Sequence, residues 1–190
     1  MYKNIQIIAE VKTRSPFGFK SRKSWGELFA VAHEIGDIIS IHTDARWGGS
    51  FDAIKKARTV TKKPILAKGI HATDNEVDQA ILAGADYVLV VGRIPGIHQE
   101  KCFIEPLTIT ELKTLPEHFK VVWNSRDLSD GNIKKETFEQ ARKIFGGWLC
   151  QASNIRTIQD IKEDADAVLV GANLIEFAKS LKTGDPEILL

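Results

Sequence analysis

The sequence predicts a single domain with the fold of a (β/α)₈ barrel. Eight short apolar runs, rich in β-branched residues, alternate along the chain with segments whose apolar residues recur at helical spacing. Strands that are apolar on both faces and separated by helices are typical of parallel sheets with right-handed crossovers, and eight such units close into a barrel. No linker or shift in composition divides the chain, so we expect one barrel domain over residues 1–190.

The predicted elements can be placed in order along the chain. The strands cover residues 5–11, 37–43, 63–69, 86–92, 102–106, 119–124, 147–153 and 166–172. The helices lie between most of these strands, at residues 24–36, 50–61, 73–85, 135–147 and 157–165. Ser24, Ser50 and Thr73 begin the first three helices, because their hydroxyl groups are suited to accept the free backbone N–H groups there.

The predicted barrel is minimal. Barrels of this TIM type usually have about 250 residues, with about 200 near the lower end, whereas this chain has 190. The missing length falls after the fourth strand, where residues 93–101 are too few for a crossover helix and include Pro95 and Gly96. We expect that helix to be lost or reduced to a turn, and the helix within residues 108–118 to be short.

The outer face of the fourth strand then needs another cover. Its side chains are apolar, and large apolar patches are rare on the surfaces of monomers. Either residues 93–101 fold back over the strand or a second copy of the chain covers it. We therefore expect a monomer or a weak homodimer, with a slight preference for the homodimer.

Composition excludes several classes of protein. A net charge of +1 argues against a dedicated nucleic-acid surface, and no apolar run reaches the roughly 18 residues of a membrane span. The N-terminus lacks a signal-peptide cleavage site, and Cys102 and Cys150 lie far apart in apolar segments, so we expect a cytoplasmic protein with reduced thiols. The histidines have no metal-ligand spacing and there is no glycine-rich nucleotide loop, so we expect no metal and no cofactor.

Charged side chains follow several of the predicted strands. In such barrels the working residues sit at the C-terminal ends of the strands, where Glu10, Lys12, Lys68 and Glu105 fall. Two lysines and two glutamates at one mouth indicate general acid–base catalysis on an anionic substrate, because burial and neighbouring charges lower the pKa of a lysine and raise that of a glutamate. A solvated rim of paired charges is the alternative, and the convergence of four such residues favours catalysis.

The same mouth is predicted to bind phosphate. Ser153 and Asn154 follow the seventh strand, and Gly171 and Ala172 follow the eighth. Barrels often bind phosphate at these two turns through backbone N–H groups at the start of a helix, and a glycine lets the backbone approach closely. Arg126, after the sixth strand, adds a further cation.

The tryptophans allow two interpretations. Trp47 and Trp123 are placed either to flank an aromatic substrate or to pack in the rim and core, and the sequence leaves both open. Trp148 has the same strand parity as Cys150 and Ala152. We therefore expect Trp148 to fill the barrel interior.

Several segments together resemble one enzyme family. They are "IAEVKTRSPFG", "ISIHTDARWGGSF", "PILAKGI", "AGADYVLVV", "FIEP", "WNSRDL", "SNIRT" and "ADAVLVGANLI", and they cover nearly the whole chain. In this order they resemble indole-3-glycerol phosphate synthase, the ring-closing enzyme of tryptophan biosynthesis. The resemblance implies a lyase that closes 1-(2-carboxyphenylamino)-1-deoxyribulose 5-phosphate to indole-3-glycerol phosphate, with loss of carbon dioxide and water.

The resemblance also implies roles for individual residues. Lys68 stands where the family has its general acid, which protonates the carbonyl oxygen during ring closure. Lys12 matches the lysine that contacts the substrate carboxylate and phosphate, and Glu105 the glutamate that acts as base or hydroxyl partner in dehydration. Glu10 matches the glutamate that orients the reacting centre, and Asn124 the asparagine that hydrogen-bonds that glutamate.

Other matching positions fall on the part of the family's site that binds substrate. Ser15 matches the serine of the first loop, which would begin a mobile cover over the site. Ser153, Asn154, Gly171 and Ala172 fall on the family's phosphate-binding turns. The expected partner is therefore a small phosphorylated substrate.

The chain also departs from the family pattern. Strand one begins almost at Met1, without the N-terminal extension that the family usually carries, and Ala152 stands in place of a site glutamate. We expect the Ala152 side chain to point into the mouth and to leave room for a glutamate there. These departures keep two alternatives open: a related phosphate-sugar lyase or isomerase, and a barrel that binds a phosphorylated ligand without catalysis.

Overall fold

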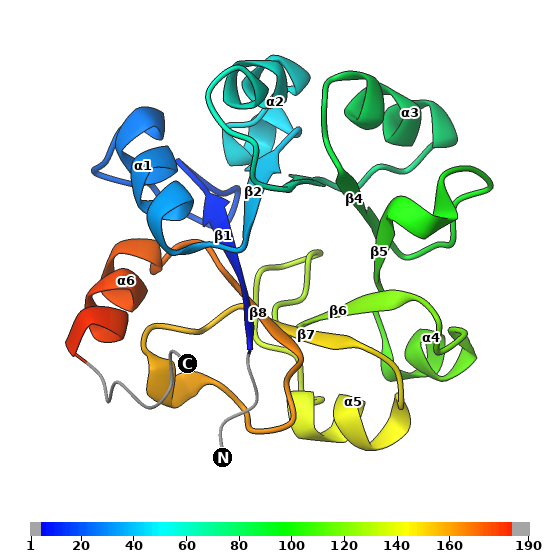
Figure 1. Ribbon diagram of the computed structural model, residues 1–190. Coiled ribbons are helices and arrows are strands. Elements are labelled where there is room, and N and C mark those ends of the chain that lie inside the picture. The colour runs from blue at the N-terminus through cyan, green and yellow to red at the C-terminus, as the bar shows by residue number, and fades with distance from the viewer. Residues whose placement is uncertain (1–4, 184–190) are drawn as a thin grey trace.

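The computed structural model describes residues 5–183, which form a closed barrel of eight parallel strands surrounded by helices (Figure 1). Each strand pairs with its neighbours in sequence, and β8 closes the barrel against β1. The strands are β1 (Gln6–Val11), β2 (Ile38–His42), β3 (Ile65–Lys68), β4 (Tyr87–Val91), β5 (Cys102–Glu105), β6 (Lys120–Asn124), β7 (Leu149–Ala152) and β8 (Ala167–Val170). The predicted fold and the order of its strands are confirmed.

The helices surround the barrel as a ring. They are α1 (Trp25–Ile35), α2 (Phe51–Arg58), α3 (Asp74–Leu82), α4 (Ile109–Thr114), α5 (Phe138–Ile144) and α6 (Leu174–Thr183). The predicted caps are confirmed, because the side chains of Ser24, Ser50 and Thr73 accept hydrogen bonds from the backbone N–H groups of Glu27, Ala53 and Glu76. The helix expected within residues 108–118 is short, as predicted, with six residues in α4.

The prediction of a helix at residues 157–165 is wrong. This segment contains a single 3₁₀ turn, η3 (Ile158–Asp160). The side chain of Gln151 donates to the carbonyl oxygen of Asp160 and accepts from the backbone N–H of Lys162. These backbone groups would bond within a helix, so the glutamine of β7 holds the segment as a turn instead.

The connection after β4 is also reduced to a turn, as predicted. It contains the 3₁₀ turn η2 (Gln99–Lys101). The outward side chains of Val88 and Val90 are nevertheless completely buried, in a cluster with Val77 and Cys102. The outer face of β4 is therefore covered within the chain and needs no second copy, so the weak homodimer stays a prediction without that support.

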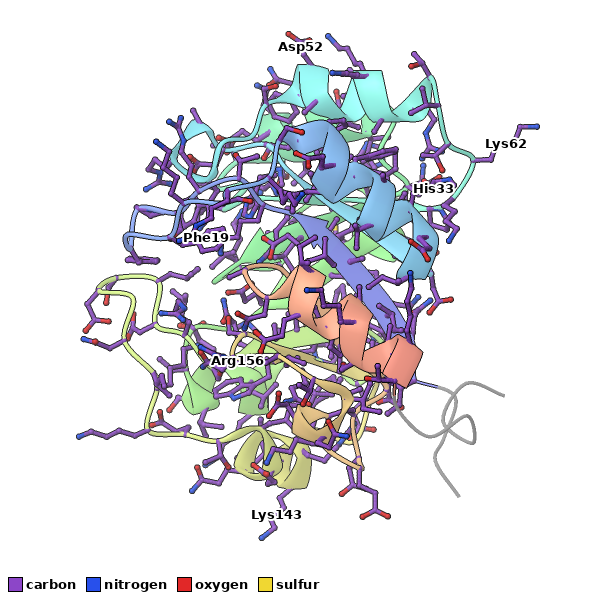
Figure 2. The ribbon with its side chains drawn as sticks, turned by 90° about the vertical axis from the view of Figure 1, so that its left-hand side faces the viewer. Phe19, His33, Asp52, Lys62, Lys143 and Arg156 are labelled. Atoms are coloured by element: carbon purple, nitrogen blue, oxygen red, sulfur yellow. The ribbon has the colours of Figure 1, made fainter. Side chains whose placement is uncertain are left out.

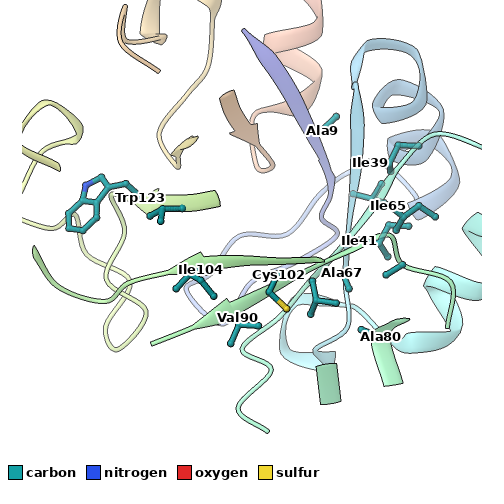
Figure 3. Packing of buried hydrophobic residues seen from close by; sticks show 14 of the residues in the cluster. Ala9, Ile39, Ile41, Ile65, Ala67, Ala80, Val90, Cys102, Ile104 and Trp123 are labelled. Atoms are coloured by element: carbon teal, nitrogen blue, oxygen red, sulfur yellow. The ribbon is translucent and has the colours of Figure 1, made fainter. Parts of the chain in front are cut away.

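Two layers of apolar side chains hold the barrel together. One lies between the strands and the helices, and Figure 3 shows part of it. Trp123 belongs to this outer layer and is 1% exposed, so it packs in the core and does not flank the site. Cys102 and Cys150 are both buried and free, as expected for reduced thiols.

The second layer fills the barrel interior and closes its N-terminal end. Its buried members are Ile8, Ile38, Leu66, Leu89, Phe103, Val122, Cys150, Ala152, Ala167 and Leu169. At the base, the ammonium of Lys120 lies 5.1 Å, 5.2 Å and 5.5 Å from the ring centroids of Tyr87, Phe103 and Trp148. Trp148 packs against the interior, as predicted. No helix within residues 5–183 is long and apolar enough to cross a membrane.

Candidate active site

The strand register brings the predicted catalytic side chains to the inner face of the barrel. Ile8 and Ile38 are paired and both face the interior, so Glu10, two residues further along β1, faces the interior as well. Lys68 ends β3 and Glu105 ends β5 on the same inner face, next to the C-terminal mouth. The loops after β1 and β6, the first of which carries Phe19, project side by side over this mouth at the left of Figure 2.

Glu10 and Lys68 form a buried ion pair. The Nζ atom of Lys68 donates to Oε1 of Glu10 over 3.2 Å, and the side chains are 14% and 3% exposed. Burial alone would raise the pKa of Glu10, but Lys68, Lys12 and His42 together hold it well below its ordinary value. Burial alone would lower the pKa of Lys68, but Glu10 and Glu105 outweigh it, so this pKa is raised. Both groups therefore carry their charges at neutral pH.

The pKa values of Glu105 and Lys12 are shifted in the opposite directions to those of Glu10 and Lys68. Burial raises the pKa of Glu105, although Lys68 and a hydrogen bond from Asn124 oppose this. Burial lowers the pKa of the Lys12 amine, Glu10 opposes the change, and Lys68 and Arg126 add to it. The mouth thus holds one glutamate that stays ionised and one that takes up a proton more readily, which is the pattern of a separated acid and base.

Asn124 links Glu105 to the turn after β7. Its Nδ2 atom donates to Oε1 of Glu105 over 2.9 Å, so the hydrogen bond expected with Glu10 is made with Glu105 instead. Its Oδ1 atom accepts from the hydroxyl of Ser153 over 2.6 Å and from the backbone N–H of Arg126 over 3.0 Å. The Asn124 amide thereby fixes the Glu105 carboxyl group relative to the predicted phosphate-binding residues.

A cavity of about 280 Å³ opens above this cluster. Its lining includes these predicted site residues: Glu10, Lys12, Ser15, Lys68, Asn124, Arg126, Ser153, Asn154, Gly171 and Ala172. Glu105 borders an adjoining cavity of about 30 Å³ together with Lys68 and Asn124. The structure thus brings all the predicted site residues to one place.

The turns that border the cavity have specialised backbones. Ser153 and Asn154 both adopt left-handed conformations, with φ of 71° and 57°. The guanidinium of Arg126 donates to Oδ1 of Asn154 over 3.3 Å. Ser15 shapes the first loop, because its hydroxyl accepts from the backbone N–H groups of Phe17 and Phe19.

Gly171 is required for a reason that the sequence did not show. Its backbone is not left-handed, but a Cβ atom added there would overlap the Glu10 carboxylate, with Cδ of Glu10 2.7 Å away. The group that approaches this backbone closely is therefore a side chain of β1. The glycine makes room for the buried ion pair at the end of β8.

Ala152 points inward, as expected, because it pairs in register with Asn124. It is 2% exposed and packs within the interior cluster, and it does not line the cavity of about 280 Å³. The expected room for a glutamate is therefore not found beside Ala152.

Sequence reasoning missed His42. It is 4% exposed, its Nε2 atom contacts Oε1 of Glu10, and its ring stacks on Trp47 with centroids 5.7 Å apart and planes at 6°. The signal that could have found it is parity, since His42 follows the inward Ser40 by two residues and pairs in register with Lys68. Trp47 borders both cavities, which favours the first of its two interpretations.

The donor groups of the site are suited to acid–base chemistry on an anion. Four cationic side chains, Lys12, Lys68, Arg126 and Arg156, border the larger cavity, which reaches the start of α6. Within residues 5–183, no group of three or more His, Cys, Asp or Glu side chains is arranged to hold a metal ion. Fold and site together define a (β/α)₈-barrel protein with buried ionisable residues of shifted pKa at its C-terminal mouth.

Comparison with known proteins identifies the family. The family model described as indole-3-glycerol phosphate synthase matches residues 1–104. The indole-3-glycerol phosphate synthase of Pyrococcus abyssi is 31% identical over 210 residues, covering 97% of this chain and 89% of that protein. The one from Sulfurisphaera tokodaii is 28% identical over 201 residues, covering 93% and 80%. The chain belongs to the indole-3-glycerol phosphate synthase family.

A solved structure supports the fold alone. The 3-hexulose-6-phosphate synthase of Salmonella typhimurium superposes with a TM-score of 0.65 over 95% of this chain and 99% of that one. Its sequence is 16% identical to this chain. The likeness is one of barrel architecture.

Proposed function

We propose that this protein closes 1-(2-carboxyphenylamino)-1-deoxyribulose 5-phosphate to indole-3-glycerol phosphate, releasing carbon dioxide and water. The observation that carries this proposal is the position of Lys68 within hydrogen-bond distance of the ionised Glu10 at the barrel mouth. A lysine that stays protonated there has the charge that ring closure needs. Membership of the family supports the same reaction.

Ring closure uses Lys68 as the acid. The aromatic carbon that bears the carboxylate attacks the ketone carbon of the ribulose chain, and the Lys68 ammonium gives its proton to the ketone oxygen. The carboxylate then leaves as carbon dioxide, and its electron pair restores the aromatic ring. The neutral Lys68 amine is left beside the new hydroxyl group, with Glu10 held close to it.

Dehydration uses Glu105. Its raised pKa allows the carboxyl group to hold a proton, which it gives to the hydroxyl as water leaves. The neighbouring CH₂ carbon loses a proton to the Lys68 amine, and the double bond of the indole ring forms. Lys68 is thereby recharged, and Glu105 regains one proton from solvent in each turnover.

The phosphate is proposed to bind at the turns after β7 and β8. Ser153, Asn154, Gly171 and Ala172 border the cavity there, at the start of α6. A crystal grown in phosphate is expected to show an anion between these two turns. Side-chain density filling that space at high phosphate concentration, without an anion, would contradict this position.

Lys12 is expected to set the alkaline limit of activity. Its lowered pKa means that its positive charge is lost at a lower pH than for an ordinary lysine, and the substrate anion then loses a partner. An arginine does not deprotonate in this range. In Lys12→Arg, the alkaline limb of the kcat/KM profile is therefore expected to move to higher pH, whatever the height of the profile. Identical limbs in the two proteins would show that another group controls it.

The decisive test is product formation. The purified protein is incubated with the carboxyphenylamino-deoxyribulose phosphate, and indole fluorescence and carbon dioxide release are followed. Formation of indole-3-glycerol phosphate and carbon dioxide in equal amounts is the expected result.

A related phosphate-sugar lyase or isomerase is the second candidate, favoured by the buried Ala152 in place of the family's glutamate. Turnover of phosphosugars that lack the aromatic ring, without indole formation, would establish that candidate. Binding of either compound without turnover would establish a barrel that binds phosphate ligands without catalysis.

A further inference from the structure

His42 occupies a position that the proposed reaction steps do not use. Oε1 of Glu10 is shared between Nζ of Lys68 and Nε2 of His42. The imidazole ring is 4% exposed and lies flat against the indole of Trp47. The guanidinium of Arg46 also lies over the Trp47 ring, 4.9 Å from its centroid. The histidine is thus held on two sides, by a carboxylate and by an aromatic plane.

The hydrogen bond to Glu10 fixes the tautomer of His42. An ionised carboxylate accepts hydrogen bonds, so Nε2 must carry the proton. Nδ1 is then an acceptor, and it has no hydrogen-bond partner among residues 5–183 although it is buried. An imidazole in this position can bond to Glu10 through one specific nitrogen, and a replacement must supply a donor at that point.

We propose that His42 is a positioning residue, which holds the Glu10 carboxylate in the orientation that pairs it with Lys68. The kinetic consequence of this inference rests on the proposed function, whereas the contact between His42 and Glu10 does not depend on that function. Without His42, Oε1 of Glu10 has one hydrogen-bond partner fewer, so the carboxylate is held less firmly. The carboxylate then leaves its alignment with Lys68.

The charged groups around His42 come from three neighbouring segments. Glu10 on β1 and Lys12 just after it face the ring from one side, Lys68 acts on it from β3, and Asp44 from the turn after β2. Burial lowers the pKa of His42, Glu10 opposes this, and the two lysines add to it. The ring is therefore neutral at neutral pH, which agrees with a donor role at Nε2.

Three variants at this position separate the possibilities. His42→Leu removes the donor, His42→Gln supplies an amide N–H near the place of Nε2, and His42→Asn supplies one near the place of Nδ1. We expect His42→Leu to lower kcat/KM by about 10–100-fold, the usual weight of a hydrogen bond to a charged group. His42→Gln is expected to recover more activity than His42→Asn. His118→Asn, at an exposed histidine between α4 and β6, is the matched control and is expected to behave like the parent.

The pH profile distinguishes positioning from a loss of packing. His42 is among the groups that lower the pKa of Glu10, so its removal is expected to raise that pKa. The acid limb of the kcat/KM profile should move to higher pH in His42→Leu and return towards the parent in His42→Gln. Equal losses in all three variants, with an unchanged acid limb, would assign His42 a packing role and overturn the proposal.

Nuclear magnetic resonance tests the contact without any substrate. The ring nitrogens of His42 are expected to show a proton on Nε2 and a bare Nδ1 at neutral pH, and the Glu10 carboxyl should titrate at higher pH in His42→Leu than in the parent. A proton on Nδ1, or an unchanged Glu10 titration, would overturn the proposal. If the parent forms no indole product while both signatures are present, the proposed reaction fails and the positioning of Glu10 by His42 stands.

Discussion

Replacing Lys68 with alanine is expected to lower turnover by about 10²–10⁴-fold, which is the usual contribution of a positioned general acid. The substitution removes the proton donor for the ketone oxygen. It also removes the cation that holds the pKa of Glu10 low and opposes the rise in the pKa of Glu105. Both glutamates then become protonated more readily, so Glu10 is no longer kept ionised while Glu105 holds a proton.

The same substitution leaves Glu10 and Glu105 buried without the cation that does most to lower the pKa of each. Removing one member of a buried ion pair typically costs about 3–5 kcal/mol of stability, so circular dichroism and thermal unfolding accompany the kinetic measurement. Lys62→Ala, at an exposed lysine before β3, is the control and is expected to keep both activity and melting temperature. A folded Lys68→Ala protein with activity within a few-fold of the parent would rule out Lys68 as the acid.

Gly171→Ala is expected to have the second largest effect, with a loss of about 10²-fold in kcat/KM. A Cβ atom at this position would overlap the Glu10 carboxylate, which Lys68 and His42 hold from the other side. Either the carboxylate rotates away from Lys68 or the turn after β8 moves. A shift of about 1 Å in a reacting group is enough for a loss of this size.

Gly26→Ala provides the matched control for this change. Gly26 lies exposed in α1, and a Cβ atom added there meets nothing within 4 Å. Because alanine favours a helix more than glycine does, the control is expected to gain about 0.5–1 kcal/mol of stability and to keep its activity. Normal activity in Gly171→Ala would show that Glu10 can move without harm to the reaction.

Most of the fold could be predicted because its signals are local. The apolar strands and the hydroxyl caps at Ser24, Ser50 and Thr73 lie in the segments that they define. The turn at residues 158–160 could not, because its backbone groups bond to Gln151 on a neighbouring strand. Burial of β4 likewise depends on side chains from several elements that no single segment reveals.

The residues of the candidate site could likewise be predicted only in part. Glu10, Lys68 and Glu105 could be placed because a charge at the end of an apolar strand is conspicuous. His42 was missed because a lone histidine in an apolar run usually belongs to the core. The need for a glycine at position 171 follows from a contact with Glu10 on β1, the strand that β8 pairs with where the barrel closes.

The base of the barrel determines how molecules move in and out. Lys120 and its three aromatic neighbours close one end, and the interior between that end and the mouth is filled with side chains. Over the mouth, Phe17 packs against Gly131, with its Cβ atom 2.9 Å from the position of an added Cβ. Any molecule that binds in the cavity must therefore enter and leave by the same end of the barrel, past these two loops.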